Sequence, residues 1–353
     1  MRILIDINHP AHVHYFRNFY EIMTSRGHEI LVISRNKEIE HALLTHYRIP
    51  FIDRGRGRTG RLSKFIYLIY ADLKILWQAL RFRPDVFLSF LHPYPAHVAF
   101  LLRRFSIAFS DTEHARLHHQ LTVPFATRIY TPDCYRIDLG AKHRRFRSFM
   151  EMCYLHPDYF TPDSSVLEEI GVKPGEVFII IRFVSWAAAH DFGHSGFSLA
   201  NKRRLISRIS SFGKVFISAE GELPEDMEQL RIRIAPHRMH HALCYATLLF
   251  GESATMASEA AMLGTPSVFL DNDGRGYTDY LEKRYGIVSN FTESERDQEH
   301  AILRAVEILE AASNGKDHRE IRSLIVSDSI NTTAFMVDEV EQLALNGKTL
   351  VAG

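Results

Sequence analysis

The chain has 353 residues, and its 42 lysines and arginines are balanced by 42 aspartates and glutamates, so the formal net charge at pH 7 is zero. This balance argues against general binding to nucleic acid. A hydrophobic content of 46% and a charged content of 24% are ordinary for a soluble globular protein, and the length predicts two domains. Three widely spaced cysteines fit a reducing cytosol and predict neither a disulfide framework nor a zinc module.

No segment has the pattern of a signal peptide or of a membrane-spanning helix. Strand-like residues begin at Arg2, and no apolar run approaches the roughly 20 residues that a membrane span requires. We therefore predict a cytoplasmic protein without a transmembrane span, with peripheral attachment at the inner membrane face as the alternative.

The first half of the sequence alternates strands and helices. Strands are predicted at residues 2–7, 29–34, 86–90, 106–110 and 128–131, and a helix at 11–26. A second helix, at 62–83, has apolar residues at helical spacing, namely Leu62, Phe65, Ile66, Ile69, Leu73, Leu76 and Leu80. Strands separated by helices imply right-handed crossovers and a parallel sheet.

The second half repeats this alternation after a polar stretch with two prolines at residues 155–163, which indicates an interdomain linker. Strands are predicted at 177–183, 214–218, 248–250 and 267–270, and helices at 200–211, 241–246, 297–312, 318–326 and 332–343. Two open parallel sheets in one chain predict ligand binding at the carboxyl ends of their strands, in the crevice between them.

The most specific signal is the segment from Gly251 to Leu270. A short apolar strand leads into a small polar turn, a helix follows and ends at Gly264, and a second apolar strand begins. The first N–H groups and the positive dipole end of such a helix can bind an anion. The small residues Ser253 to Thr255 let a phosphate approach the backbone, and Glu259, about one turn further on, can accept hydrogen bonds from a ribose diol.

The loop after the first strand carries three histidines, His9, His12 and His14. It lacks the G-x-G-x-x-G fingerprint of dinucleotide-binding proteins. A neutral imidazole here can take a proton from a hydroxyl near pH 7. The alternative is that these histidines cap the helix or pack under a neighbouring loop. Metal binding by the three is not favoured, because no carboxylate is placed locally to complete a site.

A loop in the second half also follows a predicted strand. Arg182, at the strand end, can hold a diphosphate through two hydrogen bonds. Trp186 can stack on a base or sugar ring, or serve as a core anchor. His190 and Asp191 have a metal-like but weakly specific spacing, and we favour a polar loop that orders on ligand binding. Further along, Glu220 and His237 are candidate site residues. The alternative for Glu220 is a solvated turn, and the alternative for His237 is an exposed position at the entry to a helix.

Loops at the strand ends of the first half offer further candidates. Asp111, Glu113 and His114 can provide acid, base or sugar-hydroxyl contacts, with helix capping by Asp111 or Thr112 as the structural alternative. His92 lies in a strand-end loop at residues 91–95. The basic, glycine-broken run at residues 54–61 can meet an anionic acceptor or a membrane surface, or be a solvated loop.

The second half resembles the nucleotide-sugar domain of GT-B glycosyltransferases and of UDP-N-acetylglucosamine 2-epimerase. In that superfamily a turn and helix like residues 252–261 cradle the donor diphosphate, and a helix glutamate that matches Glu259 binds the ribose. The whole chain, over about residues 1–340, resembles the bacterial and archaeal family called domain of unknown function 354. That resemblance rests on residues 6–13, 111–115, 154–157, 182–186, 220–222 and 251–266.

The superfamily resemblance has uneven implications for the first half. His12 and Val13 match a His-Val pair in the lipid-linked N-acetylglucosaminyltransferase of peptidoglycan synthesis, which favours His12 as the base. The glycines of that enzyme's loop are missing here, which implies a weaker hold on diphosphate. The epimerase usually has a His-Gly-Asp-Thr run near the position of His92, and the missing aspartate counts against epimerisation. Glu113 matches an epimerase active-site glutamate, so this alternative stays open.

The resemblance implies an α/β, GT-B-like fold with two Rossmann-like domains whose parallel sheets face a central cleft. The first, acceptor domain covers residues 1–160 and is completed by a helix from residues 330–353 that packs back on it. The second domain covers 161–329 and binds the nucleotide sugar.

We predict a glycosyltransferase that moves a sugar from a nucleotide-diphosphate donor to a hydroxyl acceptor, lipid-linked or polysaccharide, in cell-envelope or polysaccharide synthesis. His12 is the predicted base and Glu113 orients it. No metal or cofactor is expected, because a helix dipole and an arginine can balance the leaving group's charge. The alternatives are a nucleotide-sugar 2-epimerase and a non-catalytic nucleotide-sugar-binding protein. The predicted donor contacts are Arg182, Glu252, Ser253, Ala254, Thr255, Glu259 and His237.

Overall fold

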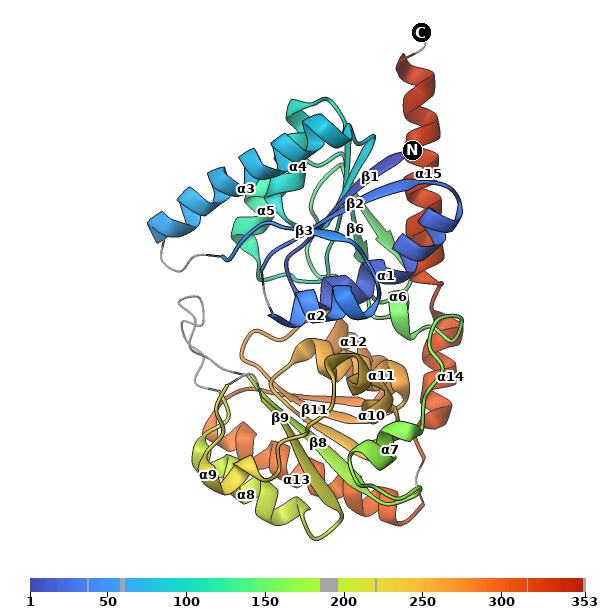
Figure 1. The fold of residues 1–353 in the computed structure, drawn as a ribbon. Helices are drawn as coiled ribbons and strands as arrows, with labels where there is room; N and C mark the ends of the chain where they lie inside the picture. Colours follow the sequence, from blue (N-terminus) through green and yellow to red (C-terminus); the bar gives the residue numbers. More distant parts are fainter. Residues whose placement is uncertain (37, 58–60, 185–195, 220, 316, 352–353) are drawn as a thin grey trace. The chain divides into compact units, whose positions relative to one another are not determined.

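The computed structural model describes residues 1–351 except 37, 58–60, 185–195, 220 and 316 (Figure 1). The chain divides into two units. Unit 1 consists of Met1–Tyr159 and Ser329–Gly353, and unit 2 of Phe160–Asp328. Each unit contains one parallel β-sheet with helices on its faces.

Unit 1 has a seven-stranded sheet in the order β3-β2-β1-β4-β5-β6-β7. β1 and β4 are apolar and almost fully buried, as expected for strands of a parallel sheet that is covered on both faces. The strand order reverses between β1 and β4, and such a switch point is where open α/β sheets bind ligands. The strands are β1 (Arg2–Ile7), β2 (Glu29–Ser34), β3 (Phe51–Asp53), β4 (Val86–Phe90), β5 (Phe105–Phe109), β6 (Arg128–Pro132) and β7 (His143–Phe146).

The helices of unit 1 form two groups around this sheet. α3 packs against α4 and α4 against α5 on one face, whereas α1 packs with α6 and with the last helix, α15, on the other (Figure 1). Met336 and Val340 of α15 are fully buried. The helices are α1 (Pro10–Ser25), α2 (Glu38–His46), α3 (Arg61–Phe82), α4 (Pro93–Leu101), α5 (Arg116–Thr122), α6 (Met152–Leu155) and α15 (Thr332–Val351).

Unit 2 has a five-stranded sheet in the order β12-β11-β10-β8-β9, which reverses between β8 and β10. A Cβ atom at Gly251 would lie 2.3 Å from the carbonyl oxygen of Arg182, so only glycine allows β10 to end this close to β8. The strands are β8 (Phe178–Phe183), β9 (Lys214–Ala219), β10 (Leu248–Gly251), β11 (Ser267–Leu270) and β12 (Val288–Phe291).

The helices of unit 2 connect these strands. Leu205 and Ile209 of α8 and Ala301 and Ile302 of α13 pack with the strands in one buried core. The helices are α7 (Ser165–Glu169), α8 (Leu199–Ile209), α9 (Glu225–Glu228), the 3₁₀ helix η1 (Pro236–Arg238), α10 (Met239–Tyr245), α11 (Ala254–Leu263), α12 (Gly276–Tyr285), α13 (Glu295–Ser313) and α14 (Arg319–Asp328).

The predicted α/β fold with two parallel sheets is confirmed. One local prediction is wrong: residues 93–95 do not belong to a loop, because Pro93 begins helix α4. Proline is tolerated in the first turn of a helix, where its missing N–H leaves no hydrogen bond unmade. The sequence prediction also omitted the elements α2, β3, α5, β7, α6, α7, α9, η1, α12 and β12.

Candidate functional site

The start of α11 has the features of an anion-binding helix end. Ser253 is the N-cap, and its hydroxyl accepts a hydrogen bond of 3.3 Å from the Met256 N–H. Ala254 and Thr255 are partly exposed, whereas the helix from Ala257 onwards is buried. Within the described residues, no acceptor is found for the N–H groups of Ala254 and Thr255. These two groups and the positive end of the helix dipole are therefore available to an anion.

Arg182 lies beside this helix end, near the end of β8. Its Nη1 donates to the Ser218 hydroxyl of β9 at 2.9 Å, and its carbonyl accepts from the Glu252 N–H at 3.1 Å. The strand ends of β9, β8 and β10 therefore bring Arg182, Ser218 and Ser253 to the switch point of the unit 2 sheet.

The predicted donor contact Glu252 is hydrogen-bonded within unit 2. Its carboxylate is buried and accepts hydrogen bonds from the backbone N–H groups of Val184, at 2.8 Å, and Phe197. Glu252 thus ties together the two ends of the loop that follows β8. Trp186, His190 and Asp191 in that loop, and Glu220 after β9, lie outside the described residues.

Glu259, the predicted ribose ligand, is buried on α11 and paired with a histidine that the sequence analysis did not select. Its Oε1 lies 2.9 Å from Nε2 of His240 on α10, and both side chains are about 5% exposed. The imidazole fixes the orientation of the carboxylate. His237 is partly exposed in η1, one turn before His240.

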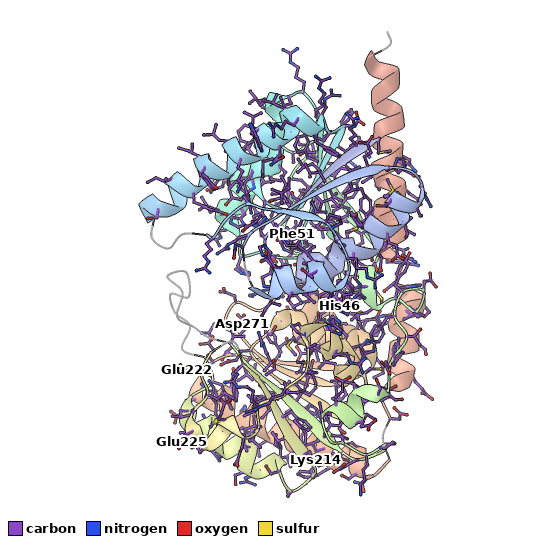
Figure 2. All side chains as sticks on the ribbon, in the orientation of Figure 1. His46, Phe51, Lys214, Glu222, Glu225 and Asp271 are labelled. Atoms are coloured by element: carbon purple, nitrogen blue, oxygen red, sulfur yellow. The ribbon has the colours of Figure 1, made fainter. Side chains whose placement is uncertain are left out.

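The sequence analysis did not select a second loop at the same edge of the sheet. Asp271 follows β11, and its Oδ1 accepts from the N–H groups of Asp273 and Gly274 at 2.6 and 3.2 Å. Its Oδ2 lies 3.2 Å from Nη2 of Arg275, the N-cap residue of α12. Figure 2 shows Asp271 at the carboxyl ends of the unit 2 strands, opposite Lys214 at the start of β9. Arg275 therefore adds a second guanidinium to this edge.

In unit 1, histidines gather where β1 and β4 end. The ring centroid of buried His12 lies 5.7 Å from that of His92, which in turn lies 5.1 Å from that of His118 on α5. His9 is the N-cap of α1, where its Nδ1 accepts from the Ala11 N–H at 3.2 Å, as the capping alternative expected. His118 was missed because its helix was not predicted.

Hydrogen bonds assign different proton positions to the two central histidines. Nδ1 of His92 lies 2.8 Å from the Phe90 carbonyl, which can only accept, so Nδ1 carries the proton and Nε2 is bare. Burial lowers the pKa of His92 well below its usual range, which keeps the ring neutral at pH 7. His12 Nδ1 instead accepts from the Asn8 N–H at 3.4 Å, so a neutral His12 carries its proton on Nε2. His92 thus offers an acceptor nitrogen and His12 a donor.

Asp111, which follows β5, is connected to these histidines through Tyr15. The Tyr15 hydroxyl donates to Asp111 Oδ2 at 3.4 Å, and the Tyr15 ring is stacked on His12 with 6.1 Å between centroids. Glu113 is buried and accepts from the Arg136 N–H at 3.3 Å, whereas His114 is exposed. The capping alternative for Asp111 and Thr112 is wrong, because α5 begins after Ala115 without a side-chain cap.

His14 does not belong to this group. Its buried ring packs beside Tyr154 and Tyr47, at 5.2 and 5.9 Å between centroids. His14 therefore packs under neighbouring residues, as the structural alternative expected. We do not include His14 in the candidate site.

A buried ionic network supports the ends of β1 and β3. Nη1 of Arg54 lies 3.5 Å from Asp6 Oδ1, and Asn8 donates to Asp6 at 2.6 Å and accepts from Arg54. The Asp6 and Arg54 side chains are fully buried, and burial raises the pKa of Asp6 to about 6. Arg54 also lies over the Tyr94 ring, 4.5 Å from its centroid. The expectation of a solvated basic loop is therefore wrong for Arg54.

Among the described residues, no three histidine, cysteine or acidic side chains are grouped closely enough to hold a metal ion. In the same part of the chain, no helix combines the length and hydrophobicity that crossing a membrane requires.

Solved structures with the same architecture include two kinds of enzyme. UDP-GlcNAc 2-epimerase from Neisseria meningitidis, bound to UDP-GlcNAc, matches with a TM-score of 0.70 and 10% identity over 97% of this chain and 100% of the other. The spinosyn forosaminyltransferase SpnP matches with a TM-score of 0.64 and 14% identity over 98% and 99%. At these identities the similarity establishes the GT-B fold.

Sequence comparison finds a relative and a matching family. An uncharacterized protein of Methanocaldococcus jannaschii, MJ0665, is 26% identical over 286 residues, which cover 75% of this chain and 80% of the relative. The profile of one family matches residues 1–273. The chain therefore belongs to the family described as protein of unknown function (DUF354).

Proposed function

We propose that the protein transfers a sugar from a nucleotide-diphosphate donor to a hydroxyl group, with unit 2 binding the donor and unit 1 supplying the base. The observation that carries this proposal is the start of α11, where two N–H groups at the switch point lie beside Arg182. The negative charge that develops on the leaving diphosphate is stabilised best by donors that are already oriented.

The rest of unit 2 supports donor recognition. Glu259, held by His240, accepts hydrogen bonds from the ribose hydroxyls in this proposal. Arg275 provides a further cationic contact for the phosphates, oriented by Asp271. Glu252 holds the ends of the loop after β8 and so shapes the site without contacting the donor.

In unit 1, the hydrogen bonds favour His92 over His12 as the base. The acceptor oxygen bonds to the anomeric carbon, the bond from that carbon to the diphosphate oxygen breaks, and the hydroxyl proton passes to the bare Nε2 of His92. His12 then donates a hydrogen bond from Nε2 to the acceptor or the sugar. Tyr15 and Asp111 hold the His12 ring in place.

An epimerase remains the second candidate, because Asp111 and Glu113 place two buried carboxylates after β5. Such a pair can remove and return a proton on one sugar without an acceptor. Against this, His92 is followed by proline, and no carboxylate stands directly after β4.

A thermal-shift screen of nucleotides and nucleotide sugars, followed by product analysis, tests the proposal. A ligand that binds the native state alone raises the unfolding temperature. We expect stabilisation by a nucleotide sugar and release of its nucleoside diphosphate only when a hydroxyl acceptor is supplied. UDP and N-acetylmannosamine formed from UDP-N-acetylglucosamine without an acceptor support the epimerase. Absence of stabilisation by any nucleotide or nucleotide sugar contradicts both functions.

A further inference from the structure

Helix α3 carries a stripe of exposed apolar side chains that the fold of unit 1 does not use. The stripe consists of Ile66, Ile69, Tyr70, Leu73, Trp77 and Leu80, which are 46–60% exposed. With 3.6 residues per turn, these six positions fall within an arc of about 100° and extend over roughly 21 Å of helix. Large apolar residues therefore form one continuous exposed face.

The opposite side of the same helix already binds α3 to unit 1. Tyr67, Ala71, Ile75 and Ala79 are buried, and Ile75 and Ala79 pack in the core with Phe87. The helix is thus apolar on two faces, of which only one faces the sheet. The exposed stripe needs an explanation outside the folding of unit 1.

Neighbouring helices extend this apolar surface. Phe100 and Leu101 at the end of α4 are 63% and 65% exposed, and Leu117 at the start of α5 is 63% exposed. α4 packs against both α3 and α5, and Figure 1 shows the three helices together on one side of unit 1. Single exposed apolar residues are common on protein surfaces, but a group on adjacent helices marks an interaction site.

The charges around the stripe indicate an anionic partner. Ten lysines and arginines but only two acidic residues occur from Arg54 to Arg104, although the whole chain has 42 of each; Arg54 itself is fully buried against Asp6, which leaves nine. Both acids are engaged: Asp72 lies 3.0 Å from a His97 nitrogen, and Asp85 accepts from the Arg2 N–H at 2.8 Å and lies 3.8 Å from Arg104, so it neutralises one of the basic residues. The local excess of positive charge is therefore only partly neutralised by these acids.

Aromatic residues within the stripe add a feature typical of lipid interfaces. The guanidinium of Arg81 lies over the Trp77 ring, 3.9 Å from its centroid, and Tyr70 has its ring on the same face. Tryptophan and tyrosine favour the boundary between lipid headgroups and acyl chains, because each joins an apolar ring to a polar group. An apolar helix face flanked by basic residues binds in the plane of an anionic membrane surface.

We propose that the exposed stripe of α3, with the adjoining end of α4 and start of α5, is a membrane-docking surface for bilayers that contain anionic phospholipids. The apolar side chains enter the headgroup boundary, and the flanking arginines contact lipid phosphates. The docking surface does not depend on the assignment of the sugar-transfer residues.

Flotation of the full-length protein with lipid vesicles tests the docking surface. We expect binding to vesicles of phosphatidylcholine mixed with phosphatidylglycerol, and much weaker binding to phosphatidylcholine alone or at high salt. The double variant Leu73→Glu/Leu80→Glu should lose at least about tenfold in binding, because it places two charges in the apolar boundary. The matched control Leu303→Glu/Leu324→Glu, on exposed leucines of unit 2, should bind like the wild type.

A second variant tests the electrostatic part and keeps every apolar side chain of the stripe. Arg81→Ala/Arg103→Ala should weaken binding to the anionic vesicles by about fivefold per residue and change binding to neutral vesicles little. Circular dichroism and thermal unfolding of all variants should match the wild type, because every substituted side chain is exposed.

Three outcomes would overturn the proposal. One is failure of the wild-type protein to bind the anionic vesicles. Another is equal loss of binding in the unit 2 control. The third is a dimer in analytical ultracentrifugation that Leu73→Glu/Leu80→Glu converts to a monomer while the wild type ignores vesicles, which would assign this face to a second copy of the chain.

Discussion

Helices α1 and α11 each follow a strand at the switch point of their sheet, yet their first turns have opposite chemistry. In α11 a serine caps the helix and two N–H groups remain available within the described residues. In α1 the first residue, Pro10, has no N–H, the Ala11 N–H donates to His9 Nδ1, and the His12 N–H donates to the His9 carbonyl. Among the described residues, backbone N–H groups are available to an anion at the start of α11 but not at the start of α1.

This difference shows that topology selects the place of a site and a few first-turn residues select its chemistry. Small residues at the start of α11 suit a phosphate, whereas the start of α1 brings imidazoles and Tyr15 to the strand ends. We infer a division between charge stabilisation in unit 2 and proton transfer in unit 1.

The largest expected effect tests the proposed role of unit 1 in proton transfer. His92→Gln should lower kcat by about 10²- to 10⁴-fold, because Nε2 of His92 is the proposed proton acceptor. His12→Gln should have a smaller effect, since its amide can still donate a hydrogen bond. The measurement is release of nucleoside diphosphate with the donor and acceptor found by screening. If His12→Gln abolished transfer and His92→Gln did not, the base would be His12, as the sequence resemblance implied.

A second test concerns what supports the unit 1 strand ends. Arg54→Met should lower the free energy of unfolding by about 3–5 kcal/mol, because it leaves a buried Asp6 carboxylate without its partner. The double variant Asp6→Asn/Arg54→Met should recover most of this loss. Denaturant unfolding measures both, and an Arg54→Met protein as stable as the wild type would show that the pair is not needed.

The pH dependence of transfer gives a further, smaller effect. Burial holds the pKa of His92 well below 6.5, so the neutral, basic form persists as the pH falls. The kcat/KM should therefore stay level from pH 8 to about 6.5 and decline only at lower pH. Asp6 titrates at about 6, and the Asp6→Asn/Arg54→Met protein controls for its contribution. A half-maximal rate above pH 6.5 would argue against His92 as the base.

The smallest expected effect separates capping from ligand binding in α11. Ser253→Ala should cost about 1 kcal/mol of unfolding free energy, because the hydroxyl that accepts from Met256 is lost. The N–H groups of Ala254 and Thr255 remain in place. Diphosphate binding should therefore fall less in Ser253→Ala than in a variant that removes one of these donors. Thermal unfolding with and without ligand measures the two contributions.

Most strands and the α11 junction could be predicted because their signals are local. Buried parallel strands appear as apolar runs, and caps such as Ser253 and Gly264 mark helix ends within a few residues. The side-chain pairs of the site depend instead on tertiary packing. Glu259 and His240 are 19 positions apart, and Tyr15 and Asp111 are 96 apart.

Helix α3 shows a different limit of sequence reasoning. Its spacing correctly predicted a helix, but residues on which that spacing rested, including Ile66, Ile69, Leu73 and Leu80, face outward. The buried side is formed by other positions, such as Ala71 and Ile75. A helix that is apolar on two faces has the right period but gives no sign of which face meets the core.

The central claim is that the first turn of α11 binds the donor diphosphate, and Ala254→Pro tests it most directly. Proline suits the first helical position, and the extended backbone of Ser253 is compatible with a following proline, so the fold should be retained. The substitution removes one N–H and makes the start of α11 resemble that of α1; Pro10→Ala in α1 is the matched control. By calorimetric titration, we expect Ala254→Pro to bind the nucleotide sugar at least about tenfold more weakly than the wild type, and Pro10→Ala to bind equally well. Unchanged affinity in a folded Ala254→Pro protein would contradict the account.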